Sequence, residues 1–303
     1  MKLSLKSILP SRDLGWNRVR AVCASSECHT KLLTKYVPGS RTGIFVGEKW
    51  FCSPDCFTQG ASEVLATYAG GCVVEMPRNP RLSIGLALVS KGYITEDQYR
   101  SAMMLSQRRG ESLETTLLKC GYANEKLLAA GRAAQWGYPA LMRELGGQPI
   151  VADLPASLFR AHRAAPIHYT AQSKRLVIGF VDRVEHALLQ SIEQITGCRA
   201  EPCFITYAEF EEQIERLTAA EGYEEVVMED HGTASQMGRL LGGWAVEIGA
   251  QEANFAKCNS SAWVRVAGKR GIVDVIFALK PISAAGKAKL STIVPEVTVN
   301  LAR

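Results

Sequence analysis

The sequence predicts an α+β protein of more than one domain, and three observations carry that prediction. The chain has 303 residues, enough for two or three domains that each bury a core. Helix patterns dominate residues 83–135, whereas mixed strand and helix patterns fill 154–217 and 233–277. Stretches rich in glycine, proline or acidic residues separate these regions. We therefore expect domains at 1–76, 81–218 and 232–303.

Four cysteines organise the first region. Cys23 and Cys28 form one close pair and Cys52 and Cys56 a second, with positions 29–51 between the pairs. Nine cysteines in a chain without an export signal indicate metal binding or buried thiols in place of disulfides. The spacing predicts a structural Zn²⁺ bound by these four thiolates, because four cysteines leave no open coordination position. The alternatives are reduced core cysteines, or His29 as a ligand in place of Cys28.

The sequence around the cysteines predicts local structure that suits a zinc site. Residues 43–51 predict two short strands around Gly47-Glu48, and Pro54 predicts the start of a helix that runs toward Tyr68. This order of knuckle, hairpin and helix is typical of treble-clef or zinc-ribbon modules. The helix dipole would help to hold the second pair of thiolates, and the metal would supply much of the folding free energy of so small a module.

A local duplication follows. Residues 83–93 and 112–122 fall in register when Gly92 is aligned with Gly121. Each copy predicts a short apolar helix, a glycine at the left-handed position after it, and a second helix. Thr95 and Gln98 have the spacing of a capping box, and Asn124 takes the place of Thr95 in the second copy. The alternative is two ordinary amphipathic hairpins in a helical bundle.

The rest of the chain predicts a small α+β region, an acidic linker, and a helix followed by a hairpin. The α+β region should contain strands at 163–170, 175–181 and 201–205, and helices at 184–195 and 207–217. The linker is expected at 221–231, the helix at 233–248, and the hairpin strands at 262–268 and 271–277.

The order of these motifs resembles a known domain. The repeat is followed by Gln135-Trp-Gly-Tyr-Pro139 and then by characteristic stretches at 154–159, 165–168, 175–182 and 195–197. From about Arg81 to Leu217 the chain is similar to the MshEN domain, which begins the ATPases of type II secretion and type IV pilus machines. Such N-terminal domains dock the motor onto an inner-membrane platform, so the resemblance implies protein–protein contact.

The C-terminal region resembles the segment that precedes the motor in the same ATPases. Gly249-Ala250 and Arg265 match that segment, but Gln251-Glu252-Ala253-Asn254 replaces the rest of its signature. A motor needs Gly-x4-Gly-Lys-Ser/Thr to wrap backbone amides around phosphates. Gly268-Lys269 and Gly286-Lys287 lack both the upstream glycine and the following hydroxyl residue. We therefore expect no ATPase and no other enzyme, and we expect His162, His168 and His186 to be packing residues.

The resemblance also raises the question of a nucleotide ligand. Family members that bind cyclic di-GMP carry Arg-Leu-Gly at the start of each repeat, where this chain has Ser83-Ile84-Gly85 and Ser112-Leu113-Glu114. Both arginines are absent and a carboxylate replaces one glycine, which would repel phosphate. The degenerate positions of this motif are Ser83, Gly85, Gly92, Ser112 and Gly121. We favour a scaffold that has lost the ligand, and keep cyclic di-GMP binding as the alternative.

Charge and hydropathy complete the functional expectation. The formal net charge is +5, from 35 basic and 30 acidic residues, which gives little support to nucleic-acid binding. Nucleic-acid binding through the zinc module is the second alternative function, and it would use Lys31, Lys35, Arg41 and Lys49 around the hairpin. No run approaches the length of a membrane span and the N-terminus lacks the apolar core of a signal peptide. The sequence therefore predicts a bacterial, cytoplasmic, non-catalytic adaptor or regulator whose partner is a protein, such as a secretion or pilus component.

Overall fold

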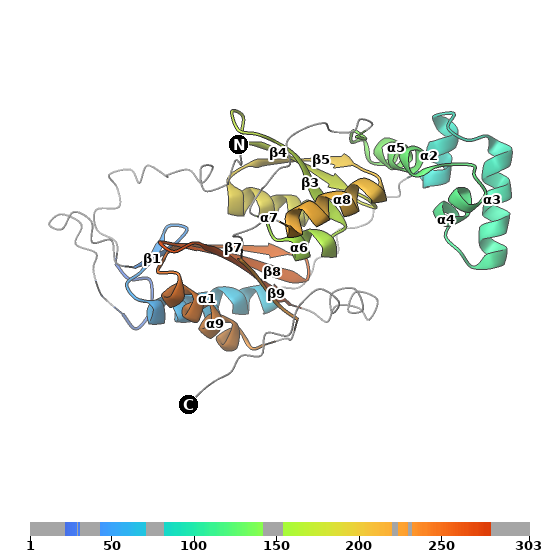
Figure 1. Cartoon of the computed structure of the whole chain (residues 1–303). Coiled ribbons are helices and arrows are strands. Elements are labelled where there is room, and N and C mark those ends of the chain that lie inside the picture. Colours follow the sequence, from blue (N-terminus) through green and yellow to red (C-terminus); the bar gives the residue numbers. More distant parts are fainter. Residues whose placement is uncertain are drawn as a thin grey trace. The chain divides into compact units, whose positions relative to one another are not determined.

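The computed structural model describes residues 22–28, 30, 43–70, 82–141, 154–219, 224–229 and 232–279. These residues fall into two compact units. Unit 1 contains the described residues of 82–219, and unit 2 contains those of 22–70 together with those of 224–279. Helices and separate sheets occur in the chain, so the predicted α+β class is confirmed (Figure 1).

The helical part of unit 1 has the predicted duplication. Its helices are α2 (Ile84–Ser90), α3 (Glu96–Arg109), α4 (Leu113–Lys119) and α5 (Glu125–Trp136). The same shift that aligns Gly92 with Gly121 also aligns the start of α2 with that of α4, and the start of α3 with that of α5. The duplicated sequence therefore folds into duplicated helices, seen in teal and green in Figure 1.

Local signals set the ends of these helices. The side chains of Ser83 and Ser112 accept hydrogen bonds from the backbone N–H groups of Leu86 and Thr115 and so cap α2 and α4. Gly92 and Gly121, one residue beyond the C-caps, both have φ of +69°, the left-handed conformation expected there. A capping box of Thr95 and Gln98 starts α3, as predicted.

A small apolar core holds the four helices together. Leu88 of α2 and Leu117 of α4, related by the repeat, are both fully buried in it. At two glycines, neighbouring side chains pack directly against the helix backbone. A Cβ on Gly131 would lie 2.7 Å from the Leu88 side chain, and one on Gly85 would lie 2.3 Å from the Tyr99 ring. Both contacts are closer than real carbon atoms approach, so a larger residue at either position would displace the neighbouring side chain.

The α+β part of unit 1 follows the helices. It consists of α6 (Ala156–Ala161), β3 (Ala164–Thr170), β4 (Arg175–Phe180), α7 (His186–Thr196), β5 (Arg199–Phe204) and α8 (Tyr207–Thr218). The strands lie in the order β3-β4-β5, with β3 antiparallel and β5 parallel to β4. These predicted strands and helices are confirmed, and α6 was not predicted. Residues 139–141 run beside the end of β5, where the N–H of Phe204 donates to the carbonyl of Pro139 at 2.9 Å.

Unit 2 is built on a six-stranded sheet with the order β2-β1-β7-β8-β9-β6. Its strands are β1 (Ile44–Val46), β2 (Lys49–Phe51), β6 (Glu224–Met228), β7 (Ala250–Cys258), β8 (Ser261–Gly268) and β9 (Ile272–Ala278). Its helices are α1 (Pro54–Gly70) and α9 (Ala234–Glu247). The predicted hairpins β1–β2 and β8–β9 are both antiparallel, as expected.

The N-terminal and C-terminal segments of the chain share this sheet and one core. Strand β1 pairs in parallel with β7, with Phe45 opposite Glu252. Phe57 of α1, Leu241 of α9 and Val264 of β8 belong to the same buried cluster. Separate domains were expected at 1–76 and 232–303, whereas the described residues of these two stretches lie together in unit 2.

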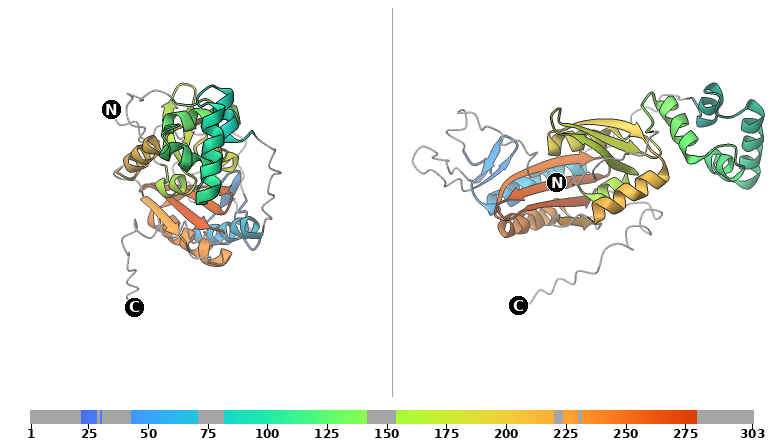
Figure 2. Two further views of the ribbon diagram at one scale, coloured as in Figure 1. Left: turned by 90° about the vertical axis from the view of Figure 1, so that its right-hand side faces the viewer. Right: turned by 45° about the horizontal axis from the view of Figure 1, so that its top comes forward.

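Two glycines allow α1 and α9 to lie side by side in unit 2, as Figure 2 shows. A Cβ on Gly238 would lie 2.0 Å from the Ser62 hydroxyl, and one on Gly242 would lie 2.0 Å from the Thr58 hydroxyl. Because neither distance leaves room for a carbon atom, the α1–α9 contact depends on both glycines.

One further prediction needs correction. The prediction of an acidic linker at 221–231 is wrong for Glu224–Met228, because these residues form β6 and pair in parallel with β9. The strand β7, which the sequence did not predict, contains the degenerate signature residues Ala250–Asn254. In the part of the chain that the structure describes, no helix has the length and apolar character of a membrane span.

A polar network is buried where β8 and β9 pair. The side chains of Arg265 and Asp274 are 1% and 0% exposed, and Arg265 Nη2 donates to Asp274 Oδ2 at 2.6 Å. The indole N–H of Trp263 donates to Asp274 Oδ1, also at 2.6 Å. The charges therefore have oppositely charged and hydrogen-bonded partners, as buried charges require.

Candidate functional site

The four predicted zinc ligands come together in unit 2. The sulfur atoms of Cys23, Cys28, Cys52 and Cys56 all lie within 4.8 Å of one another. The Sγ of Cys52 is 3.5 Å from that of Cys28 and 3.7 Å from that of Cys56. Zn–S bonds of about 2.3 Å place the sulfurs of a tetrahedral site about 3.8 Å apart. The spacing of the thiols therefore fits one Zn²⁺ ion.

Strand β2, helix α1 and the loop that carries Cys23 hold this cluster in place. Cys52 directly follows β2, and Cys56 lies in the first turn of α1, where Ser53 accepts a hydrogen bond from its N–H. The loop that carries Cys23 is bonded to β2, with the N–H of Ala24 donating to the carbonyl of Trp50 at 2.8 Å. The cluster thus joins a loop, a strand and a helix end.

A second contact fastens the cysteine loop to α1. The Ser25 hydroxyl donates to the side chain of Gln59 at 2.7 Å, and the Gln59 amide donates to Ser26 at 3.2 Å. Loop and helix are therefore tied by side chains of their own as well as through the cysteines.

The polar surroundings of the cluster favour a thiolate at Cys28. The backbone N–H of Cys52 donates to Cys23 Sγ at 3.5 Å. Hydrogen bonds from Thr30 lower the pKa of Cys28 to about 6, while burial raises the pKa of the neighbouring Cys52 to about 12. Four close thiolates repel one another, so a bound cation is what would allow all four to ionise together. His29, the alternative ligand, lies outside the described residues.

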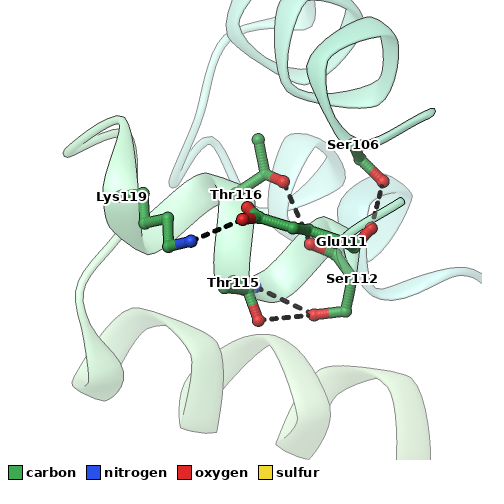
Figure 3. Close-up of polar contacts among 6 residues, drawn as sticks. All are labelled: Ser106, Glu111, Ser112, Thr115, Thr116 and Lys119. Atoms are coloured by element: carbon green, nitrogen blue, oxygen red, sulfur yellow. Dashed lines mark hydrogen bonds and ion pairs between the residues drawn. The ribbon is translucent and has the colours of Figure 1, made fainter. Parts of the chain in front are cut away.

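The predicted ligand positions of the repeat serve the fold. Ser112 caps α4 and is bonded to Thr115, as Figure 3 shows, with 2.8 Å between the two hydroxyl oxygens. Ser83 caps α2 in the same way. Gly85 is packed beneath the Tyr99 ring, so side chains fill the space beside its backbone. Gly92 and Gly121 are exposed turn residues, and nothing lies within 4 Å of a Cβ placed on either one.

The loop before α4 has polar contacts of its own. The hydroxyl of Ser106 donates to the carbonyl of Glu111 at 2.8 Å, and Lys119 Nζ lies 2.5 Å from the Glu111 carboxylate (Figure 3). Thr116 donates to the carbonyl of Ser112 at 3.1 Å. These bonds position the start of α4 without any ligand.

Sequence reasoning missed an ion-pair network on α5. Arg132, only 11% exposed, lies 2.5 Å from Glu114 of α4 and 3.6 Å from Asp182, the second residue after β4. Arg163 lies 2.7 Å from the other oxygen of Asp182. The guanidinium of Arg132 is therefore shared between two carboxylates and connects the helices to the sheet of unit 1.

The repeat itself contained a signal for this network. When the two copies are aligned, Glu114 and Arg132 correspond to Gly85 and Met103 of the first copy. A glycine and a methionine in one copy have become an oppositely charged pair in the other. The acidic residue that departs from the family motif thus has a basic partner in the same copy.

The remaining titratable candidates do not form a catalytic group. The prediction that all three histidines pack is wrong for His168, which is exposed. His186 is also exposed, but its ring centroid lies 6.4 Å from that of Tyr138. His162 instead lies 3.2 Å from Glu185, with both side chains about one-tenth exposed. Cys198 and Cys203 are buried as expected, and burial raises the pKa of Cys203 to about 12. Among the described residues, the cluster in unit 2 is the single group of metal-ligating side chains.

The comparisons with known proteins agree with the expected class. Residues 136–224 match the model of the MshEN domain, which confirms the resemblance seen in the sequence. The matched stretch runs from the end of α5 through the sheet of unit 1 to the first residue of β6. Residues 136–224 of this chain are therefore similar to the MshEN domain.

The relatives are pilus ATPases that the chain matches only in part. The type IV pilus assembly ATPase PilB of Myxococcus xanthus is 26% identical over 141 residues, which are 46% of this chain and 25% of that protein. PilB of Thermus thermophilus is 24% identical over 129 residues, 42% of this chain and 14% of that protein. The chain thus spans a quarter or less of these relatives. A solved structure of MshE with cdg is 22% identical, covering 45% of this chain and 99% of that one, with a TM-score of 0.36.

Proposed function

We propose that this chain is a non-catalytic adaptor that binds a protein of a type II secretion or type IV pilus system through unit 1. The MshEN match and the similarity to PilB support a partner from a secretion or pilus system. The printed sequence contains no Gly-x4-Gly-Lys-Ser/Thr, which supports a role without ATP hydrolysis. A cytoplasmic location and a bacterial source are part of the same proposal.

The distribution of exposed apolar side chains is the observation that carries this proposal. Exposed large hydrophobic residues that gather in one region are typical of protein-binding surfaces. Of the nine such residues in the described part of the chain, six lie in or beside α2, α3 and α4. They are Leu82, Leu86, Tyr93, Met103, Met104 and Leu118.

Affinity purification with matched variants tests the adaptor proposal. The tagged full chain is crosslinked in its host cells, purified, and its partners are identified by mass spectrometry. We expect a secretion or pilus protein, and we expect Leu118→Glu to lose it. Val246→Glu is the control, because Val246 is 63% exposed but lies on α9 in unit 2. The proposal fails if no such protein is recovered, or if both variants retain it.

A structural zinc ion in unit 2 is the second part of the proposal. The four thiols would supply a closed tetrahedral site, and a bound Zn²⁺ would hold the cysteine loop, β2 and α1 together without taking part in a reaction. We expect one zinc per purified chain by elemental analysis, and none in Cys56→Ser. Cys120→Ser, which changes a cysteine of unit 1, should keep the metal. Equal loss of metal in both variants would contradict the site.

Cyclic di-GMP binding stays the alternative, and the geometry gives it less support. Ser83 and Ser112 are occupied as helix caps, and Glu114 brings a carboxylate whose partner Arg132 is already shared. Calorimetry with cyclic di-GMP would show heat of micromolar or tighter binding if this alternative holds. For nucleic-acid binding, Lys49 is exposed, while Lys31, Lys35 and Arg41 lie outside the described residues. Binding that weakens steeply with salt would support that function.

A further inference from the structure

Helix α3 has one long face that nothing in the described structure covers. Ala102 is the only buried residue of the helix, and it lies on the opposite side from Met104, whose side chain is 56% exposed. In Figure 1, α3 lies at the right-hand edge of the helical part. Seven exposed residues at helical spacing form what we name the α3 stripe: Glu96, Asp97, Arg100, Met103, Met104, Gln107 and Arg108.

The order of residues along the α3 stripe is self-complementary. Its first turn is acidic, its centre holds two methionines, and its last turn is basic. If a second copy of the helix lies antiparallel across it, each acidic end meets a basic end and the methionines meet at the centre. The two helix dipoles also run in opposite directions, which is favourable.

The helical geometry places the opposite charges on the correct flank. The separation of Asp97 from Arg108 is close to three full helical turns of about 3.6 residues each, so both lie on one side of the stripe. A two-fold axis between two antiparallel helices keeps each flank on its own side. Asp97 of one copy therefore faces Arg108 of the other, and the same pair occurs twice.

The balance of charge favours a second copy over other partners. The stripe carries two acidic and two basic residues, so its net charge is zero. A membrane surface or an acidic peptide would select a basic stripe instead. Arg100 lies 2.8 Å from Glu96 on its own helix, but both side chains are about two-thirds exposed, so this pair contributes little.

We propose that the α3 stripe is the interface of an antiparallel homodimer of this chain. Methionine suits the centre of such a contact because its flexible side chain adapts to a neighbour. A helix of 14 residues is about 21 Å long, so this contact buries less than the roughly 1,200 Å² of stable interfaces. We therefore expect a dissociation constant in the micromolar range or weaker. The dimer does not depend on the adaptor function or on its partner.

Sedimentation velocity of the full chain up to about 500 µM tests the dimer, since this range spans micromolar dissociation constants. Asp97→Lys and Arg108→Glu should each weaken self-association by about tenfold or more, because each replaces two attractive pairs with two repulsive ones. An equimolar mixture of the two variants should associate again. In the mixed dimer the two introduced charges attract each other across one pair, and the native Asp97 and Arg108 form the other. Circular dichroism confirms that each variant keeps its helices.

A neighbouring arginine is the matched control. Arg109→Glu makes the same charge change one residue later, but a rotation of about 100° places residue 109 off the stripe. We expect this variant to dimerise like the unaltered chain. The proposal is overturned if the unaltered chain stays monomeric throughout, if Arg109→Glu weakens association as much as Arg108→Glu, or if the mixed variants stay apart. Partner recovery in the Leu118 and Val246 variants is a separate readout, so either proposal can fail alone.

Discussion

Replacing Gly242 by alanine would test how unit 2 is assembled from the two ends of the chain. The added Cβ would lie 2.0 Å from the Thr58 hydroxyl of α1. That hydroxyl donates to the carbonyl of Pro54 at 2.9 Å, so it cannot turn away without losing a hydrogen bond. Overpacking of this kind costs about 1–3 kcal/mol, and alanine in a helix gains about 0.5–1 kcal/mol over glycine. We expect Gly242→Ala to lower the free energy of unfolding of unit 2 by about 1–2 kcal/mol.

Two further variants separate crowding from helix propensity. Gly243 is exposed on the same helix and nothing lies within 4 Å of a Cβ placed there. Gly243→Ala should therefore stabilise unit 2 by about 0.5–1 kcal/mol. In a Thr58→Ala background the hydroxyl is gone, and Gly242→Ala should become nearly neutral. The double-mutant cycle then gives a coupling energy of about 1 kcal/mol or more between α1 and α9.

Urea unfolding followed by tryptophan fluorescence measures these effects. A Trp136→Phe background removes the tryptophan of unit 1 and leaves four others. Trp50, Trp244 and Trp263 are described in unit 2, and Trp16 lies outside the described residues. If Gly242→Ala stabilises the protein as much as Gly243→Ala does, α1 and α9 do not pack as described, and the reasoning is refuted.

Three other substitutions make separate predictions. Cys52→Ser should abolish zinc binding and lower the melting temperature of unit 2 while unit 1 unfolds unchanged, and a calorimetric scan that shows no shift would contradict this. Arg265→Ala should cost about 3–5 kcal/mol in urea unfolding, because it leaves the Asp274 carboxylate buried without its cation; a loss below about 1 kcal/mol would be inconsistent with the buried pair. Burial raises the pKa of Glu185, but its bonds to His162 and Arg183 outweigh that effect and lower it to about 2. The pKa of a glutamate in the unfolded chain is about 4.3, so Glu185 stabilises unit 1 above that pH. This contribution is lost as the pH falls toward 2. Glu185→Gln should therefore make the free energy of unfolding depend less on pH between about 4.3 and 2.

The elements that were predicted from sequence are those whose signals are local. Serine caps, glycines after the C-caps and the capping box of Thr95 lie within a few residues of the helix ends they set. Because the sequence repeats, the same cap signals occur in both copies, and the helices of this part agree closely with the prediction. The cysteine cluster was predicted for a related reason, since each pair of ligands is itself a short-range pattern.

The missed elements depend on contacts between distant residues. Strand β1 pairs with β7 although most of the chain lies between Phe45 and Glu252, and no local pattern marks either strand as the partner of the other. Strand β6 begins with Glu224 and Glu225, so its composition resembles a linker, and its pairing with β9 is what makes it a strand. In the same way, the partner of Glu114 lies on another helix.

The parallel pairing of β1 with β7 affects the order in which the protein can fold. Unit 1 is inserted between the two halves of unit 2, so on the ribosome the cysteine loop, β1 and α1 emerge long before β7, β8 and α9. Until β7, β8 and α9 have been synthesised, these early residues cannot complete the sheet and core of unit 2. Phe57 and Leu65 then lack the residues that bury them in the folded protein. We expect unit 1 to complete its fold first and unit 2 to close last, because pairings between distant residues form slowly.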